Sequence, residues 1–313
     1  FKQKTAYENR LSLVGSEMCI RDSLYVMGHA HQGAFRRVVR VGSTLALIEI
    51  ASVGTVDEPR LQARLLAASG AIDETALIAK IRRVANVDTD LAPFYAYARE
   101  NPALHSLIEP LYGLHTFQAD TFFEAVALTV IEQQITLKMA QTAERWLLQW
   151  ANESITYEGV TYFTFPDPVK LATCTVDDLI PMKITGIRIK VILDIARQIA
   201  SGSLDLEGLR DQPHEVVYPV LMNLRGIGHW TAAWAITRAL GDFLLVGRAD
   251  VALRAAVNHY FYGLTGRCEP ELLETTFNAY GDFAGVAGYY TLTRWAFDRY
   301  SHLIEPHPNP SPK

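Results

Sequence analysis

Two glycines and one acid stand out in the segment LRGIGHWTAAWAITRALGDFLLVGRAD, which spans residues 224–250. Gly226 and Gly228 separate two apolar helical runs, where glycine permits positive φ angles and a close approach of backbones. A turn of this kind exposes backbone N–H groups at the start of the second helix, and these groups can bind a DNA phosphate without basic side chains. The pattern therefore predicts an anion-binding helical hairpin, although a glycine turn that serves only packing looks the same.

Asp250 follows LLVGRA and precedes the helical run VALRAAV. Its side chain is suited to cap that helix, because an aspartate accepts hydrogen bonds from the first free N–H groups. A carboxylate at a helix N-terminus also stays ionised at neutral pH. We therefore expect Asp250 both to cap the helix and to be able to stabilise a developing positive charge or to orient a water molecule.

Together these residues resemble the helix-hairpin-helix DNA glycosylase superfamily, whose pattern is L-x-G-hydrophobic-G-x-x-T-A followed by an aspartate. The similarity is closest to 3-methyladenine DNA glycosylase II, the alkylation-repair branch. It extends from about Arg36 to Tyr300 and includes DLAPFYAYARENPAL, FEAVALTVIEQQIT, FPDPVKLATCTVDDL and ITGIRIKVILDIARQIASGSLDL. The resemblance implies an enzyme of base excision repair that flips out alkylated purines of the 3-methyladenine and 7-methylguanine type. It would hydrolyse the N-glycosidic bond and leave an abasic site.

The resemblance also implies roles for two residues of the segment. Asp250 would stabilise the oxocarbenium-like sugar and help to orient or deprotonate the attacking water. Trp230 occupies the position at which strand-cutting members carry a lysine that forms a Schiff base with the sugar. We therefore expect a monofunctional glycosylase without lyase activity. The alternative is a non-catalytic helix-hairpin-helix module that binds DNA for a partner; a third possibility, an oxidised-purine glycosylase with lyase activity, is disfavoured by Trp230.

An aromatic base pocket is expected from Trp230, Trp234, Trp295 and Tyr289. Trp230 and Trp234 lie four residues apart and so share one helix face, and the family alignment puts Trp295 of LTRWAF opposite them. Alkylation at N3 or N7 gives a purine a positive charge, which favours cation–π stacking and weakens the glycosidic bond. Alternatively, these aromatic residues only fill the core, as aromatic pairs at this spacing usually do.

DNA contacts are expected from the hairpin and from a second site in the first long helix. Gln133 and Gln134 fall where the family inserts a wedge into the gap left by the flipped base, or else they lie on an exposed polar face. Arg188 and Lys190 are suited either to phosphates or to the solvated surface. The hairpin residues with this role are Gly226, Ile227, Gly228, His229 and Thr231.

A monovalent cation in the hairpin is carried over from the family, with Na⁺ or K⁺ held by the backbone carbonyls of Met222, Leu224 and Ile227. No other cofactor is expected. Iron–sulfur members of the superfamily carry four closely spaced cysteines after the catalytic helix, and this chain has only Cys268 there. The three cysteines are also too far apart for a disulfide framework or a structural zinc cluster.

Composition limits the partners. The chain has 313 residues, of which 49% are hydrophobic and 20% charged, and a formal net charge of −5. This balance argues against a protein that coats nucleic acid by bulk electrostatics, so any DNA site must be local. No apolar run reaches the roughly 18 to 20 residues that cross a bilayer. We predict a soluble, cytoplasmic monomer that does not bind membranes, binds damaged double-stranded DNA and is associated with the nucleoid when bound.

The elements that must position these residues are mainly helical. We predict a small N-terminal α+β domain at 24–90 and a helical glycosylase core of two lobes at 91–302, with the hairpin near 221–232. Residues 1–23 contain LVGSEMCIRDS, which resembles translated adapter sequence, so they are expected to be a non-native leader or a disordered tail. The Pro-rich residues 303–313 are expected to be disordered.

Three local patterns complete the prediction. A hairpin is expected where FRRVVRVGSTLALIEI breaks at Gly42 and Ser43. DETALIAKIRRVANV has apolar residues at helical spacing behind acids in its first turn, which predicts a helix. The stretch ITYEGVTYFTFPDP, with alternating Tyr, Thr and Phe, predicts a short hairpin or an ordered loop.

Overall fold

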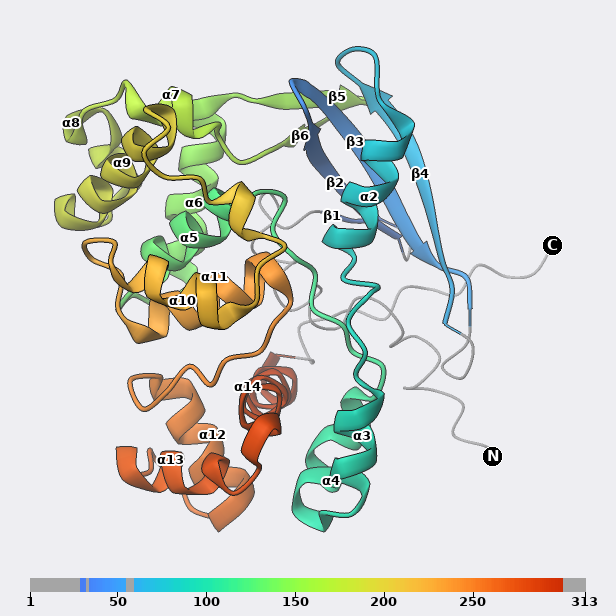
Figure 1. The fold of residues 1–313 in the computed structure, drawn as a ribbon, viewed down its shortest axis with the longest axis vertical. Helices are drawn as coiled ribbons and strands as arrows, with labels where there is room; N and C mark the ends of the chain where they lie inside the picture. Colours follow the sequence, from blue (N-terminus) through green and yellow to red (C-terminus); the bar gives the residue numbers. More distant parts are fainter. Residues whose placement is uncertain (1–28, 32–33, 55–58, 301–313) are drawn as a thin grey trace.

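The computed structural model describes residues 29–31, 34–54 and 59–300 of the chain (Figure 1). Within them the protein is mostly helical, with a small sheet region at the N-terminal side, as the sequence predicts. The expectations for residues 1–23 and 303–313 lie outside the described residues. No helix in the described part of the chain is long and apolar enough to cross a membrane.

The N-terminal sheet is antiparallel and has the strand order β1–β2–β3–β4. Its strands are β1 His29–His31, β2 Ala34–Val41, β3 Thr44–Ser52 and β4 Leu61–Ala68. The predicted hairpin is present: Val41 pairs with Thr44, and Gly42 turns the chain with a φ of +58°. Helix α2 Glu74–Val84 covers one face of the sheet, and its cap residue Asp73 accepts from the N–H of Ala76 at 3.1 Å.

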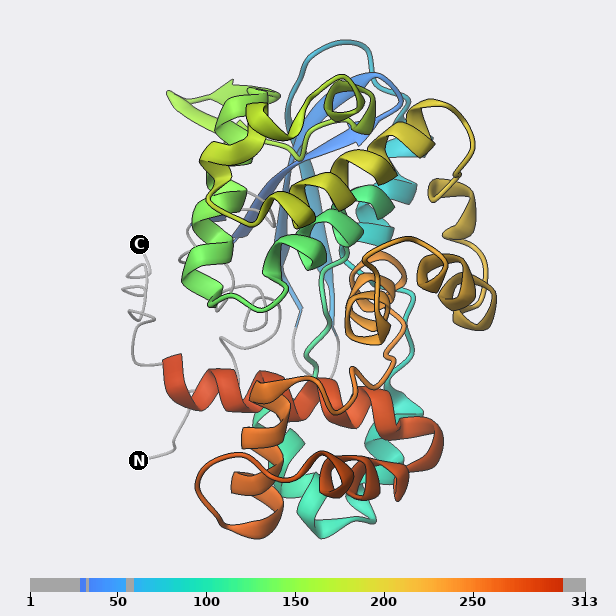
Figure 2. The same ribbon diagram turned by 90° about the vertical axis from the view of Figure 1, so that its left-hand side faces the viewer.

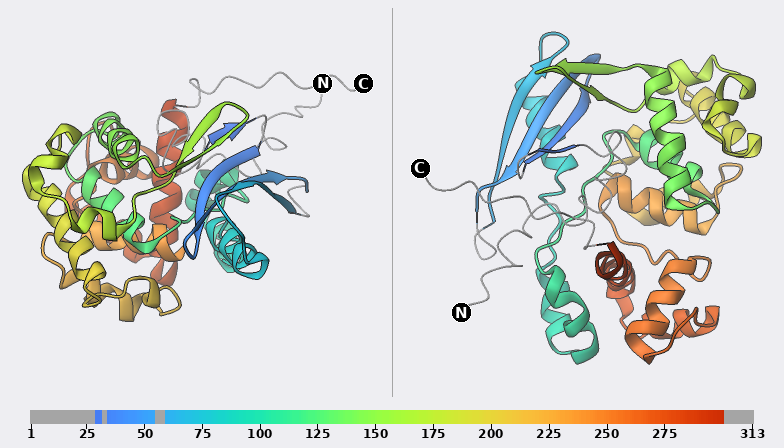
Figure 3. Two further views of the ribbon diagram at one scale, coloured as in Figure 1. Left: turned by 90° about the horizontal axis from the view of Figure 1, so that it is seen from above. Right: turned by 180° about the vertical axis from the view of Figure 1, so that it is seen from behind.

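A second hairpin covers the other face of this sheet. It is formed by β5 Ser154–Tyr157 and β6 Val160–Phe163, so the aromatic stretch is a hairpin rather than a loop. Its Ile155 and Tyr162 pack with Val38 and Leu47 of the sheet. Figure 3 shows the hairpin reaching from the helical part of the molecule across to the sheet. The sheet is therefore enclosed between α2 and a hairpin that belongs to the helical core.

The helices form two lobes around separate apolar clusters, as predicted (Figure 2). The first lobe contains α5 Phe122–Glu132, α6 Leu137–Ala151, α7 Pro168–Ala172, α8 Val176–Leu179, α9 Gly186–Ala200, α10 His214–Met222 and α11 His229–Leu240. The second lobe contains α3 Ala92–Arg99, α4 Pro102–Ile108, α12 Val251–Tyr262, α13 Pro270–Asn278 and α14 Ala284–Tyr300. Short 3₁₀ turns lie at Glu109–Leu111, Ile180–Met182, Glu207–Leu209 and Gly281–Phe283.

Two helices that are distant in sequence complete the second lobe. The chain passes from α2 into α3 and α4, which pack with α14 at the end of the chain. Phe94 of α3 lies 5.2 Å from Tyr290 of α14, measured between ring centroids. The predicted domain division near residue 90 falls between α2 and α3 and stays a prediction. The chain returns to the first lobe at α5 and crosses back after α11, so the segment between α11 and α12 joins the lobes.

The sheet is fixed to the first lobe by buried ion pairs. Arg37 of β2 donates to both carboxylate oxygens of Glu124 on α5, at 2.6 and 2.8 Å, and both side chains are buried. Lys80 of α2 pairs with the buried Asp120 at 3.0 Å. Buried charges are rarely left unpaired because desolvation is costly, so these contacts fix where the sheet docks.

Candidate active site and DNA interface

The glycine turn between α10 and α11 is present, and Gly226 is the residue that requires glycine. Its φ is +85°, and a Cβ atom added there would lie 2.4 Å from Cγ2 of Val191 on α9. The turn is closed by a hydrogen bond from the N–H of Ile227 to the carbonyl of Leu224 at 3.1 Å. The hairpin is therefore packed directly against α9, with no room for a side chain at position 226.

Gly228 does not have the positive φ angle that was expected of it. It caps α11 with a φ of −105° and a ψ of 179°, which is extended backbone that any residue adopts. A Cβ atom there would have no neighbour within 4 Å. The prediction of a positive φ was thus right for Gly226 and wrong for Gly228, because one left-handed residue is enough to reverse the chain. The space beside Gly228 is open, and no side chain caps the first N–H groups of α11.

Asp250 caps α12 as predicted, and it also accepts a hydrogen bond from a tryptophan. Its Oδ1 accepts from the N–H of Leu253 at 2.8 Å, and its Oδ2 accepts from the indole Nε1–H of Trp230 at 2.9 Å. The residue is 8% exposed, although the three residues around it on the chain, Arg248, Ala249 and Val251, are exposed. The structure therefore joins the starts of α11 and α12 at one oriented carboxylate.

The bond between Trp230 and Asp250 was not anticipated from the sequence. Trp230 was expected in a base pocket because of its spacing from Trp234 and its place in the family pattern. Position 230 itself could have revealed this bond, because strand-cutting members of the superfamily place a lysine there, near the reacting sugar. A donor at this position lies beside the carboxylate, and an indole N–H supplies a donor without supplying a nucleophile.

His229 holds the segment between the lobes against the hairpin. Its Nε2 lies 2.9 Å from the carbonyl of Leu245, and its Nδ1 lies 2.9 Å from the hydroxyl of Tyr218. Because a carbonyl only accepts, Nε2 carries a proton, and in the neutral ring Nδ1 then accepts from the tyrosine. Gly247, with a φ of +78°, packs so closely on this ring that a Cβ atom would lie 2.9 Å from it. Both ring nitrogens are thus engaged within the protein, and the DNA contact expected of His229 stays a prediction.

Trp234 and Tyr289 meet across a narrow cleft between α11 and α14. Their ring centroids are 6.4 Å apart in an edge-to-face arrangement. The cleft has a volume of about 10 Å³ and is lined by Trp234, Thr237, Leu244, Val246, Gly285, Gly288, Tyr289 and Leu292. That volume holds about one water molecule, so this cleft is too small for a purine. The neighbouring Tyr290 is buried and bonds to the carbonyl of Leu114 at 2.8 Å, which makes it part of the core.

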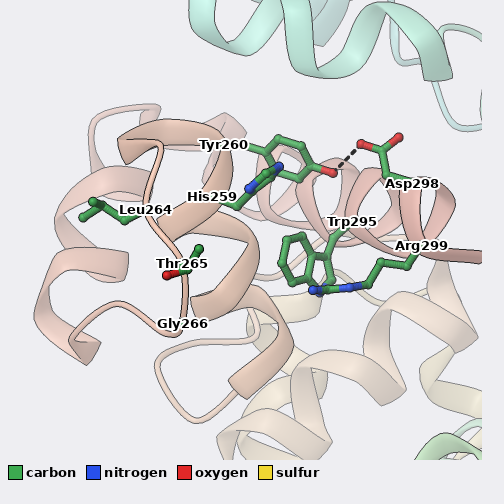
Figure 4. A pocket seen from close by; sticks show the side chains of 8 residues that line it. All are labelled: His259, Tyr260, Leu264, Thr265, Gly266, Trp295, Asp298 and Arg299. Atoms are coloured by element: carbon green, nitrogen blue, oxygen red, sulfur yellow. Dashed lines mark hydrogen bonds between the residues drawn. The ribbon is translucent and has the colours of Figure 1, made fainter.

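Trp295 does not join Trp230 and Trp234, so its predicted place has to be corrected. Its ring lies 5.5 Å from His259 and 6.1 Å from Tyr260, and the guanidinium of Arg299 lies 3.5 Å from its centroid (Figure 4). Trp295 is six positions beyond Tyr289, which places it about 9 Å further along α14 and on another face. It lines a separate cleft of about 290 Å³ between the ends of α12 and α14.

The two glutamines at the end of α5 have different surroundings. Gln133 donates from Nε2 to the carbonyl of Gly226 at 3.1 Å and to the hydroxyl of Thr231 at 2.9 Å, so it braces the hairpin. Gln134 is exposed and has a left-handed φ of +51° in the turn before α6. Of the two, only Gln134 presents a free side chain for the predicted wedge.

The two basic residues at the start of α9, Arg188 and Lys190, also have different surroundings. Lys190 pairs with Asp194 at 2.9 Å on the surface. Arg188 is buried, and burial lowers the pKa of its guanidinium. Among the residues that the structure describes, no acid lies within ion-pair distance of Arg188. Arg188 therefore remains the better candidate for a phosphate contact.

The carbonyls expected to hold a monovalent cation lie in the hairpin turn. The carbonyl of Leu224 already accepts a hydrogen bond from the N–H of Ile227, and this bond leaves one lone pair of the carbonyl oxygen free. The cation on Met222, Leu224 and Ile227 stays a prediction. In the described part of the chain, no group of three or more His, Cys, Asp or Glu side chains is placed to hold a metal ion.

Comparison with known proteins gives two curated relatives, while no protein-family model matches the chain. A DNA-3-methyladenine glycosylase of Bacillus subtilis (strain 168) is 29% identical over 207 residues, which are 65% of this chain and 67% of the relative. A putative DNA-3-methyladenine glycosylase of the same organism is 23% identical over 218 residues, 69% of this chain and 72% of the relative.

Solved structures share the fold. A 3-methyladenine DNA-glycosylase from Archaeoglobus fulgidus has a TM-score of 0.76 at 18% identity and covers 97% of this chain and 99% of its own. The apo form of an 8-oxoguanine glycosylase/lyase from Clostridium acetobutylicum has a TM-score of 0.68 at 16% identity. The match covers 92% of this chain and 93% of the other. A 3-methyladenine DNA glycosylase of Schizosaccaromyces pombe in complex with abasic DNA has a TM-score of 0.52 at 16% identity. The match covers 64% of this chain and 95% of the other.

Proposed function

The chain is a relative of the helix-hairpin-helix DNA glycosylases, as its sequence predicts, and we propose that it removes alkylated purines from double-stranded DNA by hydrolysis. The observation that carries this proposal is the carboxylate of Asp250. It is buried, fixed by the N–H groups of Leu253 and Trp230, and adjoins a hairpin whose first helical N–H groups are uncapped. The names of the curated relatives and of the Archaeoglobus fulgidus structure support the choice of alkylated bases.

The proposed reaction replaces the bond from the sugar to the base with a bond from the sugar to water. As the glycosidic bond lengthens, positive charge collects on the sugar, and a fixed carboxylate beside it lowers the barrier electrostatically. A base alkylated at N3 or N7 is cationic, so it takes the bonding electrons and leaves as a neutral molecule without being protonated. Water then adds to the sugar and passes a proton to Asp250 or to solvent, which leaves an abasic site.

DNA would be held mainly by backbone groups. The net charge of −5 excludes a broadly basic surface, whereas uncapped N–H groups at the start of α11 and the open space beside Gly228 suit a phosphate. Arg225, exposed beside Gly226, can add a charge contact. Three of the structures that share the fold were solved with DNA or a DNA ligand. Gln134 would fill the gap left by the flipped base.

A purine enters this site only if side chains move. The cleft beside Trp234 has a volume of about 10 Å³, and a flipped base must be enclosed to be read. Trp234 and Tyr289 are both partly exposed, and they meet edge to face across the cleft. We therefore expect one of these two rings to rotate when the base enters and then to stack on it.

Strand cleavage is not part of the proposal, although the fold is shared with a glycosylase/lyase. A lyase of this type needs an amine that forms a Schiff base with the sugar. The side chain at the relevant position is the indole of Trp230, whose N–H is donated to Asp250. An indole nitrogen is not a nucleophile of this kind, so the product should be an intact strand that carries an abasic site.

The test is the release of free bases from methylated duplex DNA by the purified full chain, with each base identified by chromatography. We expect 3-methyladenine or 7-methylguanine in the supernatant, strand breaks only after alkali, and no protein–DNA adduct after borohydride. Tight binding to the duplex without any released base would favour the alternative, a DNA-binding module. An adduct trapped by borohydride would show a lyase.

A further inference from the structure

Arg188, the third residue of α9, is a buried cation without a counter-charge. It is 9% exposed, and among the residues that the structure describes none forms a hydrogen bond or an ion pair with its guanidinium. The nearest acid in the sequence, Asp194, pairs with Lys190 at 2.9 Å. Asp178 of the adjacent helix α8 accepts from the N–H and the hydroxyl of Thr175, each at 2.8 Å. Because a buried charge is costly unless it is paired, Arg188 destabilises the free protein.

The start of α9 adds to this cost. A helix N-terminus carries a partial positive charge, which acids in the first turn commonly offset, but the first turn of α9 contains no acid. The cap residue Thr185 makes no side-chain bond to the turn. Within the described part of the chain, the N–H groups of Gly186 and Ile187 also have no acceptor. A full positive charge and two unpaired donors therefore lie in one helical turn.

The turn is open to a ligand from solvent. Side chains of a helix tilt toward its N-terminus, so the guanidinium of Arg188 extends back over the first turn. Its nitrogens are reached by solvent, because no nitrogen of Arg188 is fully enclosed without a hydrogen bond. Thr185 and Gly186 are exposed. Ile187 is 79% exposed, which is the highest value for a large apolar side chain in the described residues. An anion can thus reach the guanidinium and the N–H groups together.

This turn also adjoins the glycine hairpin. Val191, three residues after Arg188 and on a neighbouring part of the helix surface, is the residue against which Gly226 packs. The Cα atom of Arg188 lies about 4.5 Å from that of Val191 along the helix axis. A duplex whose phosphate binds at the hairpin therefore has further phosphates close to the first turn of α9.

We propose that the first turn of α9 and the guanidinium of Arg188 bind a second phosphate of the DNA backbone. The phosphate would accept from Arg188 and from the N–H groups of Gly186 and Ile187, and its charge would offset both the buried cation and the helix end. Arg188 thus lowers the stability of the free protein and raises its affinity for damaged and undamaged duplexes alike. This inference rests on the proposed function in one respect, that duplex DNA is the partner.

The experiment compares Arg188→Met with Lys190→Met, which removes the same charge from the same helix at an exposed, paired position. Fluorescence anisotropy over a range of salt concentrations gives the affinity of each full-length variant for damaged and undamaged duplexes. We expect Arg188→Met to bind both about tenfold more weakly at low salt. The slope of log affinity against log salt should become shallower by about 0.9, the value for one phosphate. Lys190→Met should stay within about twofold of wild type.

Melting curves without DNA supply the second readout. Arg188→Met should melt at a higher temperature than wild type, because methionine fills the same space without a buried charge. Arg188→Lys keeps a charge and should keep the wild-type salt slope. A lower melting temperature of Arg188→Met, or an unchanged slope, would show that Arg188 serves only packing. An equal loss of affinity in Lys190→Met would show a general effect of net charge and would also overturn the inference.

Two further measurements identify the source of the phosphate and separate this inference from the proposed function. If inorganic phosphate raises the melting temperature of wild type but not of Arg188→Met, while duplex affinity is the same for both, the turn binds a free anion and not DNA. A wild-type chain that releases bases, beside an unchanged salt slope in Arg188→Met, overturns this inference alone. A wild-type chain that releases no base, beside the shallower slope, overturns the proposed reaction and supports the second phosphate site.

Discussion

Asp250 combines a structural role with the catalytic role that we propose for it. One carboxylate oxygen caps α12 through Leu253, and the other is held by the indole N–H of Trp230. A cap alone needs only the first of these bonds. The second fixes the orientation of the carboxylate and ties it to the hairpin helix, which is how a group that stabilises charge must be held to act without reorganising.

The variant Trp230→Phe tests the hydrogen bond from the indole of Trp230 to the carboxylate of Asp250. The variant keeps an aromatic ring but removes the donor to Asp250. Hydrogen bonds to charged groups contribute about 1.5–3 kcal/mol, so we expect single-turnover base release to fall by at least about tenfold. Trp146→Phe is the matched control, because Trp146 packs against the core of the first lobe and does not line the proposed base pocket. Base release by Trp230→Phe equal to that of the control would mean that the indole N–H does not position the carboxylate.

At the scale of the element, the hairpin depends on one glycine and not on two. Gly226 has a left-handed φ and faces Val191, whereas Gly228 is extended with open space beside it. Gly226→Ala should therefore destabilise the fold, by roughly 1–3 kcal/mol from the strained backbone alone. Gly228→Ala should melt within about 1 °C of wild type, since its conformation suits any residue. Thermal unfolding of the two variants side by side decides this.

The same two variants, Gly226→Ala and Gly228→Ala, distinguish an effect on folding from an effect on DNA binding. If a phosphate approaches the backbone at Gly228, a methyl group there should weaken binding to damaged and undamaged duplexes alike, because phosphate contacts carry no sequence information. Fluorescence anisotropy with both duplexes measures this. Weaker binding to the damaged duplex alone would place Gly228 in the base pocket instead of the phosphate site.

A buried acid makes the stability of the first lobe depend on pH. Burial, and then the charge of Glu132, raise the pKa of Glu144 to about 8. The unfolded chain loses this proton near its ordinary pKa of about 4.3, while the folded chain keeps it. Stability is therefore lost as the pH rises from about 4.5 to 8, and it does not fall further through this group at higher pH.

Glu144→Gln should remove this loss. The variant should melt at a higher temperature than wild type at pH 8, and the two should converge near pH 4, where both folded and unfolded wild-type chains carry the proton. The check is a series of melting curves from pH 4 to pH 9. A constant difference across the series would mean that Glu144 is not held protonated in the folded chain.

Sequence reasoning succeeded where a local pattern determines the structure. The helical hairpin, the capping role of Asp250 and the turn at Gly42 each follow from a few adjacent residues. It failed where contacts join distant segments. Trp295 was predicted opposite Trp230 and Trp234, but it lies six residues beyond Tyr289 on another face of α14 and lines the cleft with His259 and Tyr260. The bonds of Trp230 to Asp250 and of Arg238 to Glu132 depend on how the helices pack, which the pattern does not specify.

At the scale of the whole molecule, the site lies where the two lobes meet along the chain. The helix α11 belongs to the first lobe and α12 to the second, and the segment between them carries the chain from one to the other. His229 and Gly247 hold this segment against the hairpin. DNA bound at the hairpin would therefore be placed in fixed relation to the carboxylate of the other lobe.

The most direct test of this account is single-turnover release of 7-methylguanine by Asp250→Asn, measured beside its affinity for the same duplex. Asparagine keeps the size and the cap, although its one oxygen can no longer serve both Leu253 and Trp230, so a melting curve confirms that the variant folds. Losing about 4 kcal/mol of charge stabilisation corresponds to roughly a thousandfold slower release. We predict this loss with unchanged or tighter DNA binding. Release above about a tenth of the wild-type rate, a barrier change under about 1.4 kcal/mol, would contradict the catalytic role of Asp250.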